Sequence, residues 1–402
     1  MKRVIKNKRR DSFTCSMIFI LTLMIFAPVN TSFAHETETH LNLNSEAVIM
    51  IDGTTGEPLY TKNEDRTMYP ASITKIVTGI IAIEAGNLDE LVTISEEATQ
   101  VTGTSVYLLE DEEITLKNLI KGMLINSGND ASTAIAEHFA GSEEAFAKKM
   151  NEFVTNTVGV TDTNFANPHG LYHPDQYTTA EDMAKITQYA LENETFREIV
   201  AIKEYDWVGE GWETTLYNHH DMVRQYDEVF GVKNGYVSQS GYTLVTSALE
   251  ENQIELIAVT LNASTADQAY EDTKELLEYG LSTYQTNEVE EGTVFEDDQQ
   301  NSYELEETLY FTSLIDEEWS SDVDNDGNLI VQAENGETLY ENKLNLSEDA
   351  TVQTTSTEEE KDLPKDDDDG HSMWWLYPIP IVGLALLALR IWRKGMFSKR
   401  IF

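Results

Sequence analysis

Cysteine is almost absent from this chain. Its 402 residues include a single cysteine, Cys15, which lies ahead of an apolar N-terminal run. We expect Cys15 to be removed with that run, so the remaining chain would hold no thiol. Disulfide bonds, a cysteine nucleophile and thiolate metal sites are thereby excluded. The length allows a main domain and a smaller one, stabilised by a hydrophobic core instead.

Basic residues are also scarce. The chain has 27 Lys and Arg against 72 Asp and Glu, a net charge of -45. Residues 1–34 hold six basic residues and one acid, and residues 373–402 hold five basic residues and no acid. The middle, 35–372, therefore has 16 basic and 71 acidic residues, a net charge of -55. Such a surface repels nucleic acid and anionic lipid, and it suits salty or alkaline surroundings where counterions screen it.

The N-terminus has the order of a secretory signal peptide. A basic region (MKRVIKNKRR) precedes an apolar run (SMIFILTLMIFAPV), and the small residues Ser32 and Ala34 have the spacing of a cleavage site. We predict a signal peptide over 1–34 and a mature chain that starts at His35.

The C-terminus predicts a membrane anchor. An acidic linker (347–372) precedes an apolar run (373–392) that opens with Trp374, Trp375 and Tyr377, and a basic tail (393–402) follows. The positive-inside rule puts that tail in the cytoplasm and the acidic body outside the cell membrane. A buried hairpin or an interfacial helix is the alternative for the apolar run.

Hydrophobic periodicity predicts strands, then helices, then three strands and a closing helix. The strands are expected at 46–52, 58–62 and in the segments VFGVKNGYV, GYTLVTSALEE and IELIAVTLNA, the last two joined by a turn at Asn252. Helices are expected at 72–85, 115–126, 131–140, 178–192, 195–202 and 266–283. This order describes an α/β (α+β) sandwich with a mostly antiparallel sheet, expected over 35–284. Short alternating segments separated by acidic turns predict a small β domain at 285–346, and no internal repeat is found.

A serine and a lysine stand three residues apart in YPASITKIVTG, at the start of an apolar helical run. Residues at this spacing are neighbours on a helix. A lysine whose pKa is depressed by burial can take the proton of Ser72, and the positive helix end can stabilise an oxyanion. Ser72 and Lys75 thus fit a Ser–Lys acyl-transfer pair, although an N-cap serine with a snorkelling lysine is the simpler alternative.

Two further motifs follow in order: Ser127-Gly128-Asn129 between two helices and Lys233-Asn234-Gly235 on a strand. S-x-x-K, S-x-N and K-T-G in this order are typical of penicillin-recognising serine enzymes. With IDGTTGEPLYTKNEDRTMYPASITKIVT, MLINSGNDAS, TNFANPHGLY, TTAEDMAKI and VKNGYVSQSGYTLVTSA, residues 45–284 resemble the low-molecular-weight penicillin-binding proteins that act as serine D-alanyl-D-alanine carboxypeptidases.

The resemblance implies a role for each matching residue. Ser72 would be the acylated nucleophile, Lys75 its base, and Ser127 a proton relay to the leaving D-alanine. The substrate-binding residues would be Asn129, Lys233, Asn234, Gly235 and Tyr236. Lys233 would hold the terminal carboxylate, Gly235 would let the peptide approach the strand edge, and the backbone N–H groups of Ser72 and Tyr236 would form the oxyanion hole. The partners would be a peptidoglycan stem peptide and, as inhibitors, β-lactam antibiotics, with no cofactor.

The chain departs from the family at Asn234, where threonine is usual, and this bears on substrate preference and rate. A non-catalytic penicillin-binding or wall-binding protein is one alternative. A class A β-lactamase is another, but TDTNFANPHGLYHPD lacks the glutamate that such an enzyme needs.

Two stretches contain metal-ligand residue types, but both favour loops. His169, His173 and Asp175 contain ligand types for zinc, but Gly170 and Pro174 favour a loop over the helix that an i, i+4 pair requires. A second stretch imitates the start of a calcium loop but lacks its closing acid at position 12, which favours an acidic hairpin turn. It comprises Asp322, Asp324, Asp326 and Gly327. No bound metal is expected.

Overall fold

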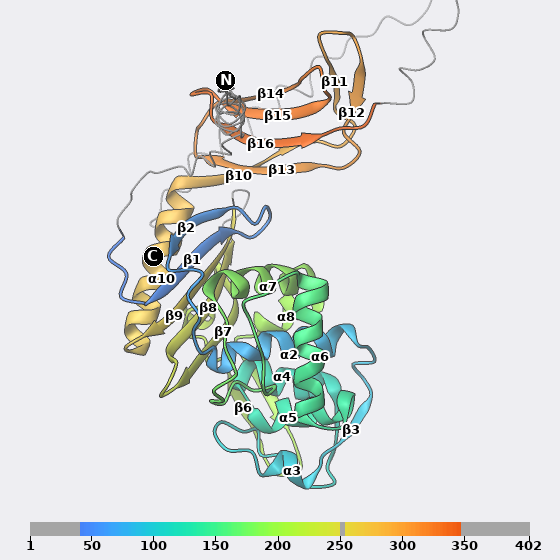
Figure 1. Ribbon diagram of the computed structural model, residues 1–402. Helices are drawn as coiled ribbons and strands as arrows, with labels where there is room; N and C mark the ends of the chain where they lie inside the picture. The colour runs from blue at the N-terminus through green and yellow to red at the C-terminus, as the bar shows by residue number, and fades with distance from the viewer. Residues whose placement is uncertain (1–40, 250–253, 347–402) are drawn as a thin grey trace, which may run out of the picture. The chain divides into compact units, whose positions relative to one another are not determined.

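The computed structural model describes residues 41–249 and 254–346 (Figure 1). Its largest sheet has five strands in the order β2-β1-β9-β8-β7, all antiparallel to their neighbours. The strands are β1 (Ala47–Asp52), β2 (Pro58–Lys62), β7 (Val229–Val237), β8 (Gly241–Leu249) and β9 (Glu255–Ala263). The N-terminal strand β1 thus pairs with β9, which follows it by some 200 residues, and closes the sheet across the chain.

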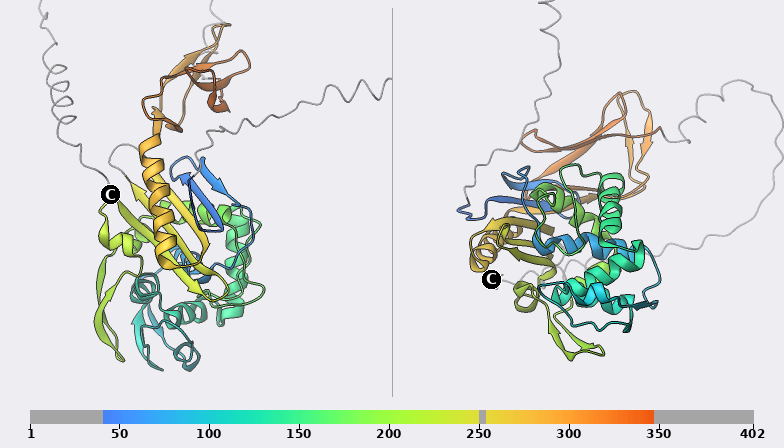
Figure 2. Two further views of the ribbon diagram at one scale, coloured as in Figure 1. Left: turned by 90° about the vertical axis from the view of Figure 1, so that its left-hand side faces the viewer. Right: turned by 60° about the horizontal axis from the view of Figure 1, so that its bottom comes forward.

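Helices lie on both faces of this sheet (Figures 1 and 2). The long helix α10 (Ala266–Thr283) packs on one face, against β8 and β9. On the other face, α7 (Ala180–Glu192) contacts β1 and β9, and α8 (Glu194–Val200) contacts β7. Because both faces are covered, the central strands β1, β8 and β9 are buried along most of their length instead of at alternate positions.

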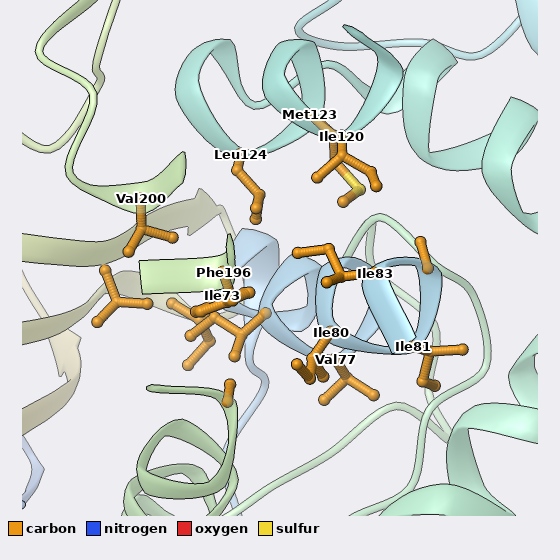
Figure 3. Packing of buried hydrophobic residues seen from close by; sticks show 14 of the residues in the cluster. Ile73, Val77, Ile80, Ile81, Ile83, Ile120, Met123, Leu124, Phe196 and Val200 are labelled. Atoms are coloured by element: carbon orange, nitrogen blue, oxygen red, sulfur yellow. The ribbon is translucent and has the colours of Figure 1, made fainter. Parts of the chain in front are cut away.

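The helix α2 (Lys75–Glu84) lies at the centre of the hydrophobic core. Ile76, Val77 and Ile80 are fully buried on it. Figure 3 shows the residues of α2 facing Ile120, Met123 and Leu124 of α4 (Leu116–Asn126), and Phe196 and Val200 of α8. A helix enclosed in this way holds its first residues, which include Lys75, in a fixed position.

The remaining helices and short hairpins complete the helical layer. They are α3 (Glu96–Thr99), α5 (Asn129–Ala140), α6 (Glu143–Phe153), the π-helical turn η2 (Val154–Val158), α9 (Asp221–Gln225) and the hairpins β3–β4 (Leu91–Thr93, Glu113–Thr115) and β5–β6 (Glu204–Val208, Glu213–Tyr217). Side-chain caps start several helices, as where Thr179 Oγ1 accepts from the backbone N–H of Asp182.

Residues 284–346 contain strands only. The strand β10 (Tyr284–Val289) pairs with β13 (Leu309–Leu314), and β11 (Val294–Glu296) pairs with β12 (Ser302–Glu304). A three-stranded sheet consists of β14 (Trp319–Val323), β15 (Asn328–Ala333) and β16 (Thr338–Lys343). Inward residues such as Phe311, Leu329 and Val331 form a separate apolar cluster.

Most elements expected from the sequence are present, and the antiparallel sheet flanked by helices is confirmed. The single helix expected at 72–85 is wrong in one respect, because a 3₁₀ turn, η1 (Ala71–Thr74), precedes α2. The sequence analysis missed α6 and the β5–β6 hairpin. Short strands such as β12 and β14 were missed because each has too few residues for a reliable period.

Several expectations lie outside the described residues: the signal peptide, the turn at Asn252, the acidic linker, the apolar run 373–392 and the basic tail. Within the described ranges, none of the helices has the length and apolar character needed to cross a membrane.

Candidate active site

Ser72 is the second residue of η1, the turn that leads into α2. Ala71, immediately before it, has a φ of 51°, which is unusual for a residue with a side chain. Thr74 Oγ1 donates to the carbonyl of Ala71 at 2.8 Å and ties the turn together. Ser72 therefore stands in a short, constrained turn rather than in the first turn of an α-helix, and its side chain is partly exposed.

Lys75 lies beneath Ser72 and has three acceptors. Its Nζ is 3.2 Å from Ser72 Oγ, 2.7 Å from Asn129 Oδ1 and 2.6 Å from the carbonyl oxygen of His169. The side chain is 0% exposed. Burial lowers the pKa of Lys75 well below its usual value and the charge of Lys233 lowers it further, while Asp130 opposes this. A lysine with a lowered pKa can be neutral near pH 7 and can accept the serine proton.

The second motif, Ser127-Gly128-Asn129, lies on the other side of Ser72 and Lys75. Ser127 caps the end of α4 in the left-handed conformation, with φ 63°, and α5 begins two residues later. Besides receiving the Lys75 contact, Asn129 donates from Nδ2 to the carbonyl of Thr102 at 2.7 Å. This carboxamide therefore connects Lys75 to the 102–106 loop and sets the position of both.

Gly235 brings strand β7 close to the serine. A Cβ atom at this position would lie 2.6 Å from the backbone nitrogen of Ser72 and 2.7 Å from Thr243 Oγ1. Neither group can move freely, because Thr243 donates to the carbonyl of Pro70. Close packing therefore requires glycine at this position. A glycine also leaves the strand edge open to the backbone of a peptide.

Lys233 and Asn234 lie on β7 beside this contact. Lys233 is 1% exposed, and burial lowers its pKa to about 7. Its Nζ donates to the backbone carbonyl of Asn234 at 2.9 Å and to Asn234 Oδ1 at 3.1 Å. Asn234 Nδ2 donates in turn to the carbonyl of His219 at 3.1 Å.

These elements enclose a pocket of about 280 Å³. Of the eight site residues predicted from the sequence, five line it directly: Ser72, Ser127, Asn234, Gly235 and Tyr236. Lys75, Asn129 and Lys233 are buried next to lining residues. The structure thus brings the three sequence motifs together around Ser72.

The pocket also contains residues that the sequence analysis missed. Thr104, His219 and Tyr270 line it, as do Tyr242, Thr243, Leu244, Ala266 and Ala269. Burial, together with the charges of Lys233 and Arg224, lowers the pKa of His219 to about 4, so this imidazole is neutral at pH 7. Thr104, His219 and Tyr270 lie 32, 147 and 198 residues after Ser72, and no local sequence pattern links them to the motifs.

The candidate metal ligands make other contacts in the structure. His169 Nε2 lies 3.2 Å from Glu143 Oε1, and His173 Nδ1 accepts from the backbone N–H of Asp175. Asp324 accepts from the N–H groups of Asp326 and Asn328 in the hairpin turn between β14 and β15, as expected for an acidic turn. In the described part of the chain, no group of three or more His, Cys, Asp or Glu side chains has the arrangement of a metal site.

A serine beside a buried lysine, with an amide-lined strand edge alongside, defines a serine acyl-transfer enzyme. Comparison with known families makes this class specific: a family model described as D-alanyl-D-alanine carboxypeptidase (peptidase family S11) matches residues 34–265. The chain belongs to this family of serine peptidases, and it is a hydrolase.

Individual relatives agree with this assignment. The chain is 34% identical over 282 residues to the D-alanyl-D-alanine carboxypeptidase DacF of Bacillus subtilis, an alignment that spans 68% of this chain and 71% of that protein. It is 34% identical over 257 residues to DacA of Escherichia coli K12, covering 61% of this chain and 62% of that protein. Penicillin binding protein 5 from Haemophilus influenzae superposes with a TM-score of 0.68 at 25% identity, over 77% of this chain and 98% of that one.

Proposed function

We propose that this protein is a serine D-alanyl-D-alanine carboxypeptidase that removes the terminal D-alanine from peptidoglycan pentapeptide stems. The contact of Ser72 Oγ with the buried, deprotonatable Nζ of Lys75 carries this proposal. The family match and the presence of all three motifs around one pocket support it.

The reaction proceeds through an ester on Ser72. Ser72 Oγ attacks the carbonyl of the penultimate D-alanine while neutral Lys75 accepts the hydroxyl proton. The backbone N–H groups of Ser72 and Tyr236 stabilise the oxyanion. Ser127 passes a proton to the departing nitrogen, D-alanine leaves, and water hydrolyses the ester to release the shortened peptide and free Ser72. β-Lactams acylate Ser72 by the same attack on their ring carbonyl.

Substrate binding follows from the strand edge. A stem peptide adds alongside β7, with Asn129 bonding its backbone and Gly235 allowing its close approach. Lys233 supplies positive charge near the terminal carboxylate, through or beside Asn234.

The proposed location is the outer face of the cell membrane. A signal peptide over 1–34 directs export, and the apolar run 373–392 retains the protein in the membrane with the tail 393–402 inside. The catalytic domain (35–284), the small β domain (285–346) and the linker (347–372) then face the wall. The basic charges of both ends against the acidic body support this orientation.

One experiment tests the activity. The purified protein is incubated with a stem peptide ending in D-Ala-D-Ala, and released D-alanine is measured. We expect stoichiometric D-alanine and tetrapeptide. Acylation of Ser72 by a fluorescent penicillin without any D-alanine release would instead support a non-catalytic binding protein.

A further inference from the structure

An exposed aromatic surface lies on the loop that continues from the pocket residue Thr104. Tyr107 on this loop is 62% exposed, and Leu109 is exposed as well. The Tyr107 ring meets the ring of Trp212, on the turn between β5 and β6, edge to face with 5.0 Å between the ring centroids. Tyr107, Leu109 and Trp212 are called the aromatic patch below. The proposed reaction uses none of them.

Tyr107 is held in an unfavourable backbone conformation. Its φ is 59°, in the left-handed region that bulky side chains rarely adopt. The residues on either side fix it there, because the backbone N–H groups of Val106 and Leu108 both donate to the buried carboxylate of Asp130, at 3.0 and 3.2 Å. Backbone strain persists only where the surrounding structure holds it, and it is common at ligand-binding sites.

A second buried carboxylate joins the loop to the β5–β6 hairpin. Glu112, which is 3% exposed, accepts from the backbone N–H of Leu109 at 2.9 Å and from that of Glu210 at 2.8 Å. Gly211 lies against the loop as well, since a Cβ there would be 2.4 Å from the carbonyl oxygen of Tyr107. The aromatic patch is therefore fixed in place before any ligand arrives, and binding to it would cost little conformational entropy.

The aromatic patch is within reach of a substrate bound at Ser72. The Thr104 carbonyl accepts at 2.7 Å from the backbone N–H of Asn129, the residue proposed to bond the stem backbone, so the loop begins on that side of the pocket. Tyr107 is three residues further, which places its Cα within ~11 Å of that of Thr104. Four stem residues separate the scissile bond from the glycan strand, and they span up to ~14 Å when extended. A stem bound at Ser72 can thus bring its sugar to the patch.

The surroundings of the aromatic patch favour a neutral ligand that is rich in hydroxyl groups. Neither 101–116 nor 204–217 contains Lys or Arg, and five exposed acids flank the patch: Glu110, Asp111, Glu113, Glu210 and Glu213. Carboxylates accept hydrogen bonds from hydroxyl and amide groups, whereas they repel nucleic acid, anionic lipid and acidic protein surfaces. The apolar face of a sugar ring can pack on an exposed tyrosine ring. Where a stem is attached, the lactyl carboxyl group of the glycan is in amide linkage, so the sugars there are neutral.

We propose that the aromatic patch binds an N-acetylated sugar of the glycan strand that carries the stem. The preferred substrate is then a glycan-linked stem rather than a free peptide. This rests on the proposed carboxypeptidase function and specifies the form of its substrate. The patch does not touch the reacting atoms, so its binding energy holds the remote end of the substrate and lowers KM.

Two substrates with the same pentapeptide stem test the proposal. One carries the N-acetylglucosaminyl-N-acetylmuramyl disaccharide on its first residue, and the other carries an acetyl group on the same nitrogen. Released D-alanine gives kcat/KM for each with the full-length protein. We expect a value about fivefold higher for the glycan-linked stem, with the difference in KM rather than in kcat.

The variant Tyr107→Asn links the preference to the aromatic patch. Asparagine removes the ring and tolerates the left-handed conformation, so the ratio of the two kcat/KM values should fall from about five to about one. Tyr107→Phe keeps the ring and should retain most of the ratio. Tyr310→Asn makes the same exchange at an exposed tyrosine of β13, outside the patch and the pocket, and should leave the ratio unchanged.

Equal kcat/KM values for the two substrates, or a ratio that Tyr107→Asn does not lower, would overturn the proposal. So would a dimer of the wild-type protein that Tyr107→Asn dissociates, because a second copy of the chain would then occupy the patch. If the acetylated peptide still loses D-alanine and penicillin still acylates Ser72, only the glycan proposal fails. If neither substrate is cleaved and penicillin does not label Ser72, the carboxypeptidase function itself fails.

Discussion

Ser72 contributes chemistry to the site and little to the packing around it. Its hydroxyl accepts a hydrogen bond from Lys75 and is partly exposed in the pocket, whereas the neighbouring Ile73 is fully buried. The nucleophile Ser72 and the core residue Ile73 are therefore neighbours in one turn, and replacing the Ser72 hydroxyl leaves the core packing of Ile73 in place.

Ser72→Ala should abolish covalent labelling by penicillin and leave the thermal unfolding temperature nearly unchanged. The Ser72 hydroxyl contacts the Nζ of the buried Lys75, so the substitution removes the nucleophile that the penicillin acylates. Mass spectrometry of the labelled wild-type protein provides the measurement, with the adduct expected on the peptide that contains Ser72. An adduct on Ser127 or any other residue would contradict the assignment.

The buried lysine of β7 should make stability depend on pH. An unfolded lysine titrates near ~10.4, while Lys233 in the fold titrates at about 7. Between these values the unfolded chain binds more protons, so the stability of the wild-type protein rises with pH through that window. The loss of folding stability caused by burying a charged Lys233 is therefore largest below pH 7.

Lys233→Met should therefore raise the unfolding temperature at pH 6, by roughly 2–4 °C for each kcal/mol recovered, and the gain should shrink at pH 9. Penicillin acylation should fall in the same variant. Lys185→Met, at an exposed lysine paired with Glu181, is the control and should show no such pH-dependent gain. A gain that grows toward pH 9 would have the wrong sign for this explanation.

At the scale of elements, the position of the base Lys75 depends on the loop that contains His169, and this loop is held by α6. The His169 carbonyl accepts from Lys75, and the His169 ring is held between Glu143 of α6, at 3.2 Å from Nε2, and the backbone N–H of Leu171, at 3.1 Å from Nδ1. Gly170 is pressed against η1, where a Cβ would lie 1.9 Å from the Ala71 oxygen. The loop thus contacts nucleophile and base together.

Glu143→Ala should slow penicillin acylation about tenfold, because the loop that places the His169 carbonyl would lose its anchor on α6. Glu143→Gln keeps an acceptor for His169 Nε2–H and should retain most of the rate. A pH profile of acylation should show a shifted ascending limb in the alanine variant, since Lys75 loses part of its hydrogen bonding.

Glu144→Ala provides the matched control, because this neighbour is exposed and pairs with Lys148 on the surface. Equal losses in Glu143→Ala and Glu144→Ala would show that α6 stability, rather than the position of Lys75, controls the rate.

At the scale of the whole molecule, the chain combines an acidic body with basic ends. The order of Leu363-Pro364, an apolar run and a basic tail is similar to a Gram-positive wall-sorting signal. However, Asp366 and Asp367 stand where a sortase needs threonine and glycine, and two carboxylates at the scissile bond oppose that chemistry. An acidic linker that happens to contain Leu-Pro is the alternative, and in both cases the apolar run would be retained.

Cell fractionation should therefore release the protein with detergent and not with muramidase alone. The released protein should still contain the peptides from residue 373 onward. The linker of about 25 residues would let the catalytic domain reach stem peptides several tens of Å from the membrane. Release only after wall digestion, with loss of those peptides, would show that sorting occurs and that the anchor is wrong.

The sequence by itself determined the elements whose signals are local. The helices α4 and α10 follow from periodic apolar residues, because burial of one face repeats along the chain, and the strand β1 follows from a short continuous apolar run. The three motifs could be recognised for a similar reason: Ser72 and Lys75, or Lys233 and Gly235, are near neighbours in the sequence, so the chemistry can be seen without a fold.

The tertiary structure alone decided how those parts work together. Lys75 meets Asn129 and His169 across separations of 54 and 94 residues, and the Tyr270 hydroxyl reaches the His219 carbonyl across 51. Such contacts depend on how helices and strands pack, and no sequence period encodes that. The hydrogen bond from the Asn234 carboxamide to the carbonyl of His219 is likewise set by the packing of β7 against the segment before α9.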